Sequence, residues 1–357
     1  MKVGGMPNDV LRVVQWTTGN VAAEAVKALL TRPDLALVGA YAYSPEKVGL
    51  DIGKLCNLGT DVGVYATNDV DALLELQPDC IIYTPLHFDV VEVQRLLRAG
   101  VNIVTSAEFL TGMNLSDSDR AAIEAAARDG DATIFGSGMN PGFAQMVAAV
   151  SSGVSTNVRK ASMTESVDVS QFIGDANFQS VGWGRPRGDP GHADDVRRGT
   201  LVFAEAVDVF ARMMGIDLNE ILCDVEFAYA TDDVVADGVS IPAGHVAGMN
   251  VKWYGNVDGA EVLAVNQRWV ATQSLDPPWT VEHGYRIEIL GDPSVYVKVD
   301  MMPTAEDLAD LTPERMRGIG LRITAAPLIN AIPAVCAATS GIATYAELPA
   351  ISARLFA

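Results

Sequence analysis

Short apolar runs alternate with amphipathic stretches over the first part of the chain. The runs are apolar throughout, which indicates strands buried on both faces, and the stretches between them have helical spacing. The predicted strands are LRVVQW (11–16), LALVGAYAY (35–43), VGVYA (62–66), CIIYTP (80–85), VNIVT (101–105) and ATIFGSG (132–138). The predicted helices are VAAEAVKALLTR (21–32), DVDALLELQ (69–77), VVEVQRLLRAG (90–100) and DRAAIEAAARDG (119–130). This alternation, with right-handed crossovers, predicts an α/β fold with a doubly wound parallel sheet of the Rossmann type.

Beyond about residue 160 the apolar residues recur at every second position. The predicted strands there are RKASMTESVDVSQF (159–172), VAGMNVKWYGNV (246–257), AEVLAVNQRWVAT (260–272), YRIEILG (285–291) and SVYVKVDM (294–301). Such alternation indicates an antiparallel sheet with one partly solvated face. An amphipathic helix at 200–215 is expected to pack on it. We therefore expect a second domain, of the α+β type with a mainly antiparallel sheet, at residues 143–317.

The C-terminal region is nearly continuous in apolar residues. The stretch 318–339 predicts a buried helix that is interrupted at Pro327 and Pro333. We expect the helical segment 318–357 to pack back on the first domain, residues 1–142, which is the predicted NAD(P)-binding domain.

Composition and charge limit the partners. The 357 residues include 25 Lys and Arg against 45 Asp and Glu, a net charge of −20 that repels nucleic acid and anionic lipid. No apolar run approaches the ~20 residues of a membrane span, and MKVGGMPND (1–9) lacks the apolar stretch of a signal peptide. The four cysteines and four histidines show no metal-ligand spacing. We expect a cytoplasmic protein without a metal, a nucleic-acid partner or a membrane partner.

The segment WTTGNVAAEA (16–25) follows the first strand and opens the first helix. Matched to GxGxxG, it places Thr17, Gly19 and Ala22 at the three glycine positions. The middle glycine allows the backbone to approach a pyrophosphate, and the helix N-terminus offers free amides. Because one of three glycines is present, an ordinary strand-to-helix turn is the alternative. Its position after the first strand favours dinucleotide binding.

The end of the second strand bears on the choice of cofactor. An NAD site usually has Asp or Glu there, whereas this strand continues into Tyr43-Ser44-Pro45-Glu46-Lys47. Ser44 could donate to a 2′-phosphate and Lys47 could neutralise it; a solvated loop lysine is the alternative for Lys47. We therefore expect NADP to be preferred, with NAD still open.

Glu108, in VNIVTSAEFL (101–110), is a candidate acid/base. It follows a strand end by three residues, and the crevice beyond the carboxyl ends of the strands holds the ligand in doubly wound sheets. Its apolar flanks predict a poorly solvated carboxylate suited to proton transfer. The alternatives are a cap of the following turn or a pair with a remote arginine. Of the seven lysines only Lys47 falls at a strand end, so a lysine acid is not expected.

The segment GSGMNPGF (136–143) ends the last predicted strand of the first domain. Asn140 could hold a nicotinamide carboxamide or a substrate group. The glycines at 136, 138 and 142 indicate close backbone approach or a hinge. The residues expected at the cofactor are Thr17, Thr18, Gly19, Asn20, Val21, Ser44, Lys47, Thr84, Pro85, Thr105 and Asn140.

Several of these segments resemble a known family. RVVQWTTGNV, VGAYAYSPEKVGLDIG, VNIVTSAEF, GSGMNPGF and INAIPAVCAATSGIAT are similar to the dihydrodipicolinate-reductase-like NAD(P)-dependent oxidoreductases, most of all to 2,4-diaminopentanoate dehydrogenase and the native amine dehydrogenases. The resemblance implies a Rossmann domain, an open-faced substrate domain and a homodimer. It implies that a ketone or aldehyde, ammonia and NAD(P)H are reversibly coupled to an amine. It places the acid/base at Glu108, the cofactor phosphates at residues 18–21 and the nicotinamide end at Asn140.

Two departures from the family pattern matter. The family usually has glycine at the positions of Thr17 and Ala22. The His-His pair and lysine with which dihydrodipicolinate reductase binds its diacid are not found. A small hydrophobic ketone suits the apolar residues Phe143, Met146, Phe172, Phe178 and Trp183 better. We therefore expect an amine dehydrogenase. The alternatives are a diamine or amino-alcohol dehydrogenase, in which Glu165 or Asp168 holds a remote ammonium, and an NADP-sensing protein without catalysis.

Overall fold

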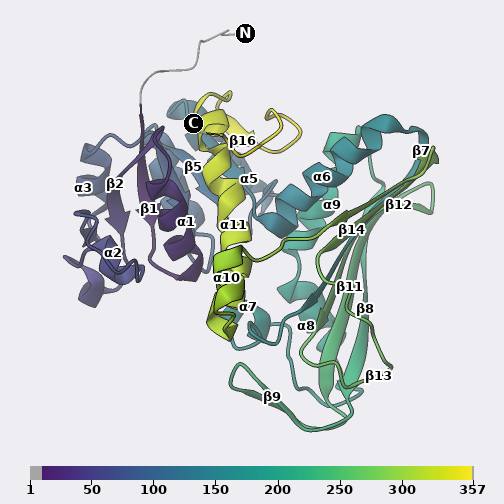
Figure 1. Cartoon of the computed structure of the whole chain (residues 1–357). Coiled ribbons are helices and arrows are strands. Elements are labelled where there is room, and N and C mark those ends of the chain that lie inside the picture. The colour runs from purple at the N-terminus through teal and green to yellow at the C-terminus, as the bar shows by residue number, and fades with distance from the viewer. Residues whose placement is uncertain (1–9, 356–357) are drawn as a thin grey trace. The chain divides into compact units, whose positions relative to one another are not determined.

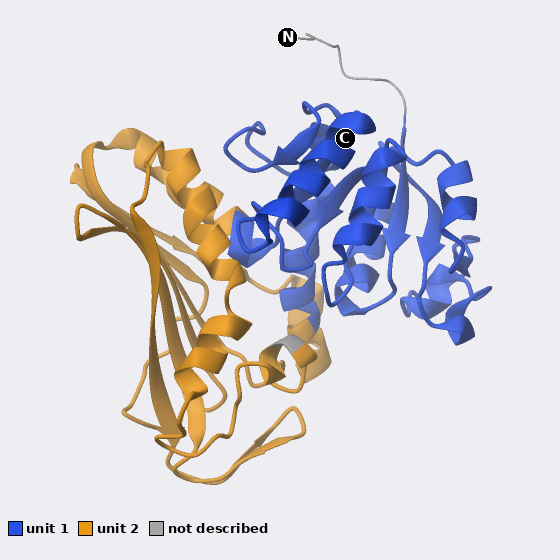
Figure 2. Ribbon diagram, turned by 180° about the vertical axis from the view of Figure 1, so that it is seen from behind, with its two compact units in different colours: residues 1–142, 318–357 blue, residues 143–317 orange. Residues whose placement is uncertain are grey.

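The computed structural model describes residues 10–355, so the segment 1–9, in which no signal peptide was expected, lies outside the described residues. The chain divides into two compact units (Figures 1 and 2). Unit 1 comprises Met1–Gly142 and Gly318–Ala357, and unit 2 comprises Phe143–Arg317.

Unit 1 is built on a seven-stranded sheet of order β16-β6-β5-β4-β1-β2-β3. Its strands are β1 Leu11–Trp16, β2 Leu35–Tyr41, β3 Ala66–Thr67, β4 Cys80–Tyr83, β5 Asn102–Thr105, β6 Thr133–Gly136 and β16 Gly341–Ala343. Neighbouring strands pair in parallel, and β1 lies between β2 and β4, so the strand order reverses there. In doubly wound folds the ligand crevice lies at this switch point. The predicted Rossmann-type sheet is confirmed.

Helices cover both faces of this sheet. The helices of unit 1 that precede unit 2 are α1 Asn20–Leu30, η1 Pro45–Lys47, α2 Ile52–Leu55, α3 Val70–Glu75, α4 Val90–Arg98 and α5 Asp117–Asp129. One face packs against α3, α4 and α5, and the other packs against α1. The side chains of Asp69, Asp89 and Ser116 accept hydrogen bonds from first-turn amides, which fixes where α3, α4 and α5 begin.

The C-terminal region differs from its prediction in two respects. The helix α11, Pro313–Cys336, runs without a break through Pro327 and Pro333, so the predicted interruption is wrong. Each proline removes one helical hydrogen bond, but buried neighbours such as Leu328 and Ile332 hold the helix in place. The chain after α11 is not helical: β16 pairs with β6 and extends the sheet of unit 1.

By length and composition, α11 is the one helix in the described part of the chain that could cross a membrane, with a mean hydropathy of 1.5 over its most apolar 18 residues. Core helices of globular proteins pass the same test. Asn330 on α11 accepts a hydrogen bond from Arg32 at 3.0 Å, and the Cys336 thiol contacts the carbonyl oxygen of Asp79. These contacts make α11 part of the core of unit 1.

Unit 2 contains a second seven-stranded sheet, of order β13-β8-β11-β12-β7-β14-β15. Its strands are β7 Thr156–Asp168, β8 Glu220–Ala230, β11 Val246–Val257, β12 Ala260–Val270, β13 Leu275–Asp276, β14 Tyr285–Asp292 and β15 Val295–Val299. All neighbours pair antiparallel except β12 and β7. The predicted, mainly antiparallel sheet is therefore confirmed. A separate hairpin is formed by β9 Val234–Ala236 and β10 Val239–Ile241.

Helices pack on one face of this second sheet (Figure 1). The helices of unit 2 are α6 Ala144–Ser151, η3 Ser152–Val154, α7 Ala176–Gln179, α8 His192–Gly199, α9 Val202–Met214 and α10 Ala305–Ala309. The Trp253 indole of β11 donates to the Thr200 hydroxyl just before α9, and Phe203 of α9 contacts Trp269 of β12. The helices therefore cover the face to which Trp253 and Trp269 belong, and the opposite face is open.

Candidate functional site

The segments that follow β1, β2 and β4 line a cavity of about 200 Å³ in unit 1. Its lining residues are Thr17, Thr18, Gly19, Ala42, Tyr43, Ser44, Lys47, Thr84, Pro85 and Leu86. All but three of these were predicted to bind a cofactor, and the fold brings them together from three separate segments. Ala42, Tyr43 and Leu86 were not assigned by the sequence.

The turn from β1 into α1 has the features of a phosphate-binding turn. Gly19 is the N-cap of α1, and no side chain caps this helix. A Cβ placed on Gly19 would meet no atom within 4 Å, so the space beside its backbone is open to a ligand. The first-turn amides are left without a side-chain partner, as a phosphate requires. At the third motif position, Ala22 is 1% exposed and allows α1 to pack closely on the sheet.

Thr17 replaces the first glycine of the motif but keeps the backbone conformation of a glycine. Its φ is +79°, in the left-handed region that β-branched residues rarely adopt. Holding such a residue there costs roughly 1–2 kcal/mol. The Thr17 hydroxyl lies 3.1 Å from the carbonyl oxygen of Thr84 and 3.2 Å from its hydroxyl, and these bonds offset part of the strain. They also tie the turn to the end of β4.

Lys47 supplies the positive charge of the cavity. Its Nζ donates to the Thr18 hydroxyl at 3.0 Å, so it reaches from η1 to the phosphate turn and is not a free loop lysine. Glu46 is exposed and does not line the cavity, and none of the lining residues is acidic. The cavity therefore favours an anionic group even though the chain as a whole is acidic.

The remaining residues predicted at the cofactor do not line this cavity. Asn20 is exposed and Val21 half-buried in the first turn of α1. Asn140 is half-buried in the irregular segment Met139–Phe143 after β6. Thr105 is fully buried, and its hydroxyl accepts a hydrogen bond from the amide of Ala107 at 3.0 Å. Thr105 therefore supports the turn that leads to Glu108.

Glu108 lies in this turn, between the buried residues Ala107 and Phe109. Its φ is +44°, and its amide donates to the carbonyl oxygen of Ser106 at 3.2 Å. The side chain is exposed, so the poor solvation predicted from its flanks is wrong: the apolar neighbours turn inward and the carboxylate turns outward. Within the described part of the chain the carboxylate has no hydrogen bond or ion pair, so it is neither a cap nor the partner of an arginine there.

Two neighbours fix the position of the Glu108 turn. A Cβ on Gly136, at the end of β6, would come within 1.7 Å of the carbonyl oxygen of Phe109. Only glycine allows this approach, which confirms the close backbone contact predicted at position 136. The Phe109 ring stacks on Phe88 with centroids 4.7 Å apart. The backbone contact with Gly136 and this ring contact together hold the turn in place.

Aromatic side chains gather at the carboxyl ends of the central strands. Trp16 and Tyr41 stack with centroids 4.1 Å apart, and Tyr43 meets Tyr41 edge-on at 4.9 Å. Glu92 of α4 accepts hydrogen bonds from Trp16, Tyr43 and Tyr83. This cluster was not predicted from the sequence. The sequence does hold a signal for this cluster, because an aromatic residue lies at or near the end of each of three predicted strands.

Unit 2 carries the apolar residues predicted for the substrate. They are Phe143, Met146, Phe172, Phe178 and Trp183. Phe172 and Phe178 have ring centroids 6.2 Å apart, and Phe178 meets Trp269 of β12 at 5.3 Å. No ring contact within the described residues joins Phe143 or Trp183 to this group. The structure therefore brings part of the predicted set together and adds Trp269.

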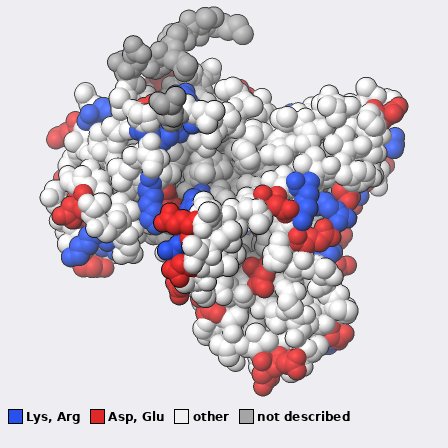
Figure 3. All heavy atoms as spheres, in the orientation of Figure 1, with Lys and Arg blue, Asp and Glu red and all other residues white. Residues whose placement is uncertain are grey.

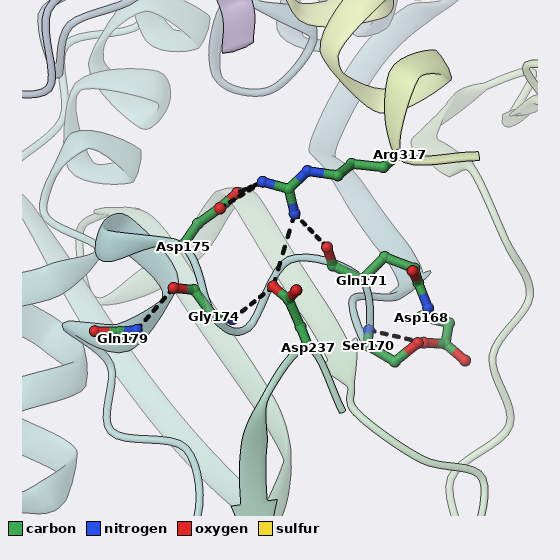
Figure 4. Close-up of polar contacts among 8 residues, drawn as sticks. All are labelled: Asp168, Ser170, Gln171, Gly174, Asp175, Gln179, Asp237 and Arg317. Carbon is green, nitrogen blue, oxygen red and sulfur yellow. Dashed lines mark hydrogen bonds and ion pairs between the residues drawn. The ribbon is translucent and has the colours of Figure 1, made fainter. Parts of the chain in front are cut away.

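Arg317 anchors the loop that carries Phe172 (Figure 4). Its guanidinium donates to both carboxylate oxygens of Asp175, one of them at 2.7 Å, and to the carbonyl oxygen of Gln171. It lies 3.7 Å from the carboxylate of Asp237, and its central carbon is 5.1 Å from the Phe172 ring centroid. One arginine thus joins three segments of unit 2.

Buried polar atoms without a partner lie beside this aromatic group. Gln267 is fully buried two residues before Trp269 on β12, and neither of its amide atoms nor the Trp269 indole nitrogen has a hydrogen-bond partner within the described residues. Glu165 of β7 is the register partner of Gln267. Tyr285 is buried next to Glu165, and burial, followed by the charge of Glu165, raises the pKa of this phenol well above its usual value.

Acidic and basic side chains are interspersed on the face drawn in Figure 3, separated by uncharged surface. No continuous basic area appears on that face for a nucleic acid to bind. Among the residues with described positions, no group of three or more His, Cys, Asp or Glu side chains is placed to hold a metal ion.

Comparisons with known proteins agree with this architecture. Residues 143–356 match the family model described as the 2,4-diaminopentanoate dehydrogenase C-terminal domain. The chain is 26% identical over 315 residues to an amine dehydrogenase from Streptomyces virginiae, which covers 84% of this chain and 87% of that protein. It is similar to the solved structure of an amine dehydrogenase from Mycobacterium smegmatis, with a TM-score of 0.78 and 23% identity over 98% of this chain and 99% of that one. A shorter stretch, 34% identical over 90 residues, is similar to 4-hydroxy-tetrahydrodipicolinate reductase from Synechococcus elongatus, covering 21% of this chain and 33% of that protein.

Proposed function

Because this chain belongs to the family defined by the 2,4-diaminopentanoate dehydrogenase C-terminal domain, we propose that it is an amine dehydrogenase. The chain is an NAD(P)-dependent oxidoreductase. The proposed reaction is the reversible reductive amination of a small hydrophobic ketone or aldehyde with ammonia. The observation that carries the proposal is Glu108, an exposed carboxylate without a partner in the described chain, held in a left-handed turn beyond β5.

The cavity in unit 1 fits the phosphate-bearing half of a nicotinamide dinucleotide. The open backbone at Gly19 leaves room for the pyrophosphate at the N-terminus of α1. Lys47 and Ser44 follow β2, the strand after which the 2′ position of the ribose is usually read in this fold, and no acidic side chain lines the cavity. These features support a preference for NADP over NAD. When bound, the nicotinamide supplies or accepts the hydride.

The proton transfers of the proposed reaction are assigned to Glu108. Ammonia in neutral water is mostly ammonium, whose nitrogen has no free electron pair, so a base must remove a proton before nitrogen attacks the carbonyl carbon. Glu108 accepts that proton and returns it to the oxygen that leaves as water. An exposed carboxylate in a rigid turn suits this role, because solvent can exchange protons with it between steps. The Thr105 contact and Gly136 keep the turn in place.

The substrate is assigned to unit 2, whose apolar set is Phe143, Met146, Phe172, Phe178 and Trp183. The half-buried rings of Phe172 and Phe178 next to Trp269 offer an apolar surface, and the charged neighbour Arg317 is already paired with Asp175. Such a surface favours a small hydrophobic carbonyl compound over a diacid.

One observation favours a second candidate, a diamine or amino-alcohol dehydrogenase. Buried polar groups are nearly always hydrogen-bonded, yet both amide atoms of Gln267 have no partner in the described chain. Its register partner Glu165 was one of two acidic residues proposed to hold a remote ammonium, the other being Asp168. The Asp168 carboxylate accepts a hydrogen bond from the amide of Ser170 at 2.9 Å, and the Glu165 carboxylate is hydrogen-bonded to the buried phenol of Tyr285. A second polar group on the substrate would therefore bind near Gln267 and Glu165.

The proposal includes a homodimer in the cytoplasm. The open face of the second sheet carries a hydrogen-bonded row in which Asn250 donates to Glu226 at 2.9 Å and Asn266 donates to Asn250 at 3.1 Å. We assign this row, on the face of the sheet opposite the helices, to contact with a second copy. Light scattering of the purified chain tests this: a mass of one chain, 37.8 kDa, would contradict it.

The experiment that tests the function is Glu108→Gln. The amide keeps the size of the side chain but cannot take up a proton, so turnover should fall by about 100-fold or more, while the affinity for NADPH is unchanged. The matched control is Asp131→Asn, because Asp131 is also an exposed carboxylate with a positive φ, +51°, in unit 1. Full activity of Glu108→Gln, or an equal loss in the control, would remove Glu108 from the mechanism.

A further inference from the structure

Glu92 has a hydrogen-bonding role that the reaction does not explain. Its Oε2 accepts from the Tyr43 hydroxyl at 2.6 Å, the Tyr83 hydroxyl at 2.7 Å and the Trp16 indole at 3.1 Å. No lysine or arginine of the described chain forms an ion pair with it. A single carboxylate oxygen thus joins side chains from the ends of β2, β4 and β1.

The consequence of this arrangement is a fixed Tyr43 ring. Tyr43 is 49% exposed, and a side chain exposed to that extent ordinarily samples several rotamers. Its hydroxyl is bonded to Glu92, and its ring rests edge-on against Tyr41, which is stacked on Trp16. Burial of the hydroxyl end, together with the neighbouring Glu92, raises the pKa of Tyr43, so the phenol remains a hydrogen-bond donor at any working pH. The ring is therefore held in place while part of its surface stays open.

This open ring lines the same cavity as the phosphate turn. Leu86, 52% exposed, lines the cavity as well, so two large apolar side chains stand beside Lys47 and Gly19. A rigid aromatic face loses little conformational freedom on binding and stacks on any nucleic-acid base. In a dinucleotide that places its phosphates at Gly19 and Lys47, the flat, uncharged group next to them is the adenine.

We propose that Glu92 is a positioning residue that holds Tyr43 as the surface on which the adenine of the cofactor stacks. The inference rests on the proposed use of a nicotinamide dinucleotide. Glu92 itself touches no reacting atom, so its effect belongs to the affinity for the adenosine half of the cofactor. The nicotinamide end and the chemistry are not affected.

Binding of 2′,5′-ADP, which is the adenosine half of NADP, to the full-length chain tests this inference by calorimetry. Tyr43→Ala and Glu92→Ala should each raise its Kd about tenfold, the usual scale of one lost stacking contact. Glu92→Gln keeps an acceptor oxygen and should restore most of the affinity. In a Tyr43→Ala background, Glu92→Ala should not raise the Kd further, because there is no ring left to position. With NADPH, the loss should appear in KM and not in kcat.

Two further measurements separate positioning from general damage. Tyr43→Phe leaves Glu92 hydrogen-bonded to Tyr83 and Trp16. It is therefore the substitute if Glu92→Ala does not fold, and it should weaken the binding of 2′,5′-ADP several-fold. Reduction driven by NMNH, which lacks the adenosine half, should change by less than about twofold in every variant. An unchanged Kd in Glu92→Ala and Tyr43→Phe, or a Glu92→Ala loss that persists in the Tyr43→Ala background, overturns the inference. A wild-type chain that binds neither 2′,5′-ADP nor any nicotinamide dinucleotide overturns the proposed function instead.

Discussion

Lys47 is the residue on which the choice between NADP and NAD depends most. Its ammonium already touches Thr18 beside Gly19 and Ser44, and a charge-assisted bond to a phosphate is worth about 1.5–3 kcal/mol. Lys47→Ala should therefore raise KM for NADPH by about ten- to a hundredfold and change KM for NADH much less. Initial rates with the two cofactors measure this ratio. The control is Lys54→Ala, an exposed lysine of the same unit; an equal loss with both cofactors would contradict a 2′-phosphate contact.

Single residues show where the sequence was informative and where it was not. The position of Gly19 at the start of a helix after the first strand was readable, because strand, glycine and helix follow one another in the sequence. The φ of +79° at Thr17 could not be predicted from the sequence. Its strain is offset by hydrogen bonds to Thr84, which lies 67 positions away. The exposure of Glu108 was likewise hidden: apolar neighbours in the sequence say nothing about which way each side chain turns.

At the scale of elements, strands with clear apolar patterns could be predicted from the sequence. Strands that form mainly because a neighbouring strand offers an edge could not. The strand β8, EILCDVEFAYA, was overlooked because Glu220, Asp224 and Glu226 interrupt its apolar residues; in the fold it pairs with β11. The strand β16 has three residues and exists because β6 leaves an open edge beside it. Prolines 327 and 333 predict a break that tertiary packing around α11 prevents.

The loop anchored by Arg317 gives a prediction at the same scale. Arg317→Met removes the bonds to Asp175 and Gln171, which hold the segment around Phe172, and should loosen that loop. The carbonyl substrate should then show a KM several-fold higher, with KM for NADPH unchanged, and hydrogen exchange at 170–176 should be faster. Arg317→Lys keeps one charged contact, so its KM for the carbonyl substrate should lie between the values of the wild type and Arg317→Met.

A matched control for this loop is Arg286→Met. Arg286 lies on β14 of the same unit, is about half exposed and pairs with Glu282 and Glu288 without touching the loop. If both variants changed the substrate KM equally, the effect would come from lost surface charge and the anchoring role of Arg317 would be wrong.

At the scale of the whole molecule, the residues proposed for the cofactor and those proposed for the substrate lie in different units. Unit 1 holds the cavity, Lys47 and Glu108, and unit 2 holds the aromatic group around Phe178 and Trp269. With a net charge of −20, the chain attracts its anionic cofactor only through local donors. Higher salt should therefore weaken NADPH binding by screening Lys47, although the protein as a whole repels the cofactor.

The central claim is that this enzyme forms amines from carbonyl compounds and ammonia. The most direct measurement is the rate of NADPH oxidation with a panel of small hydrophobic ketones and aldehydes, each with and without ammonium, together with detection of the product. The expected result is oxidation that requires ammonium and yields the amine. Oxidation at the same rate without ammonium, with an alcohol as the product, would contradict it.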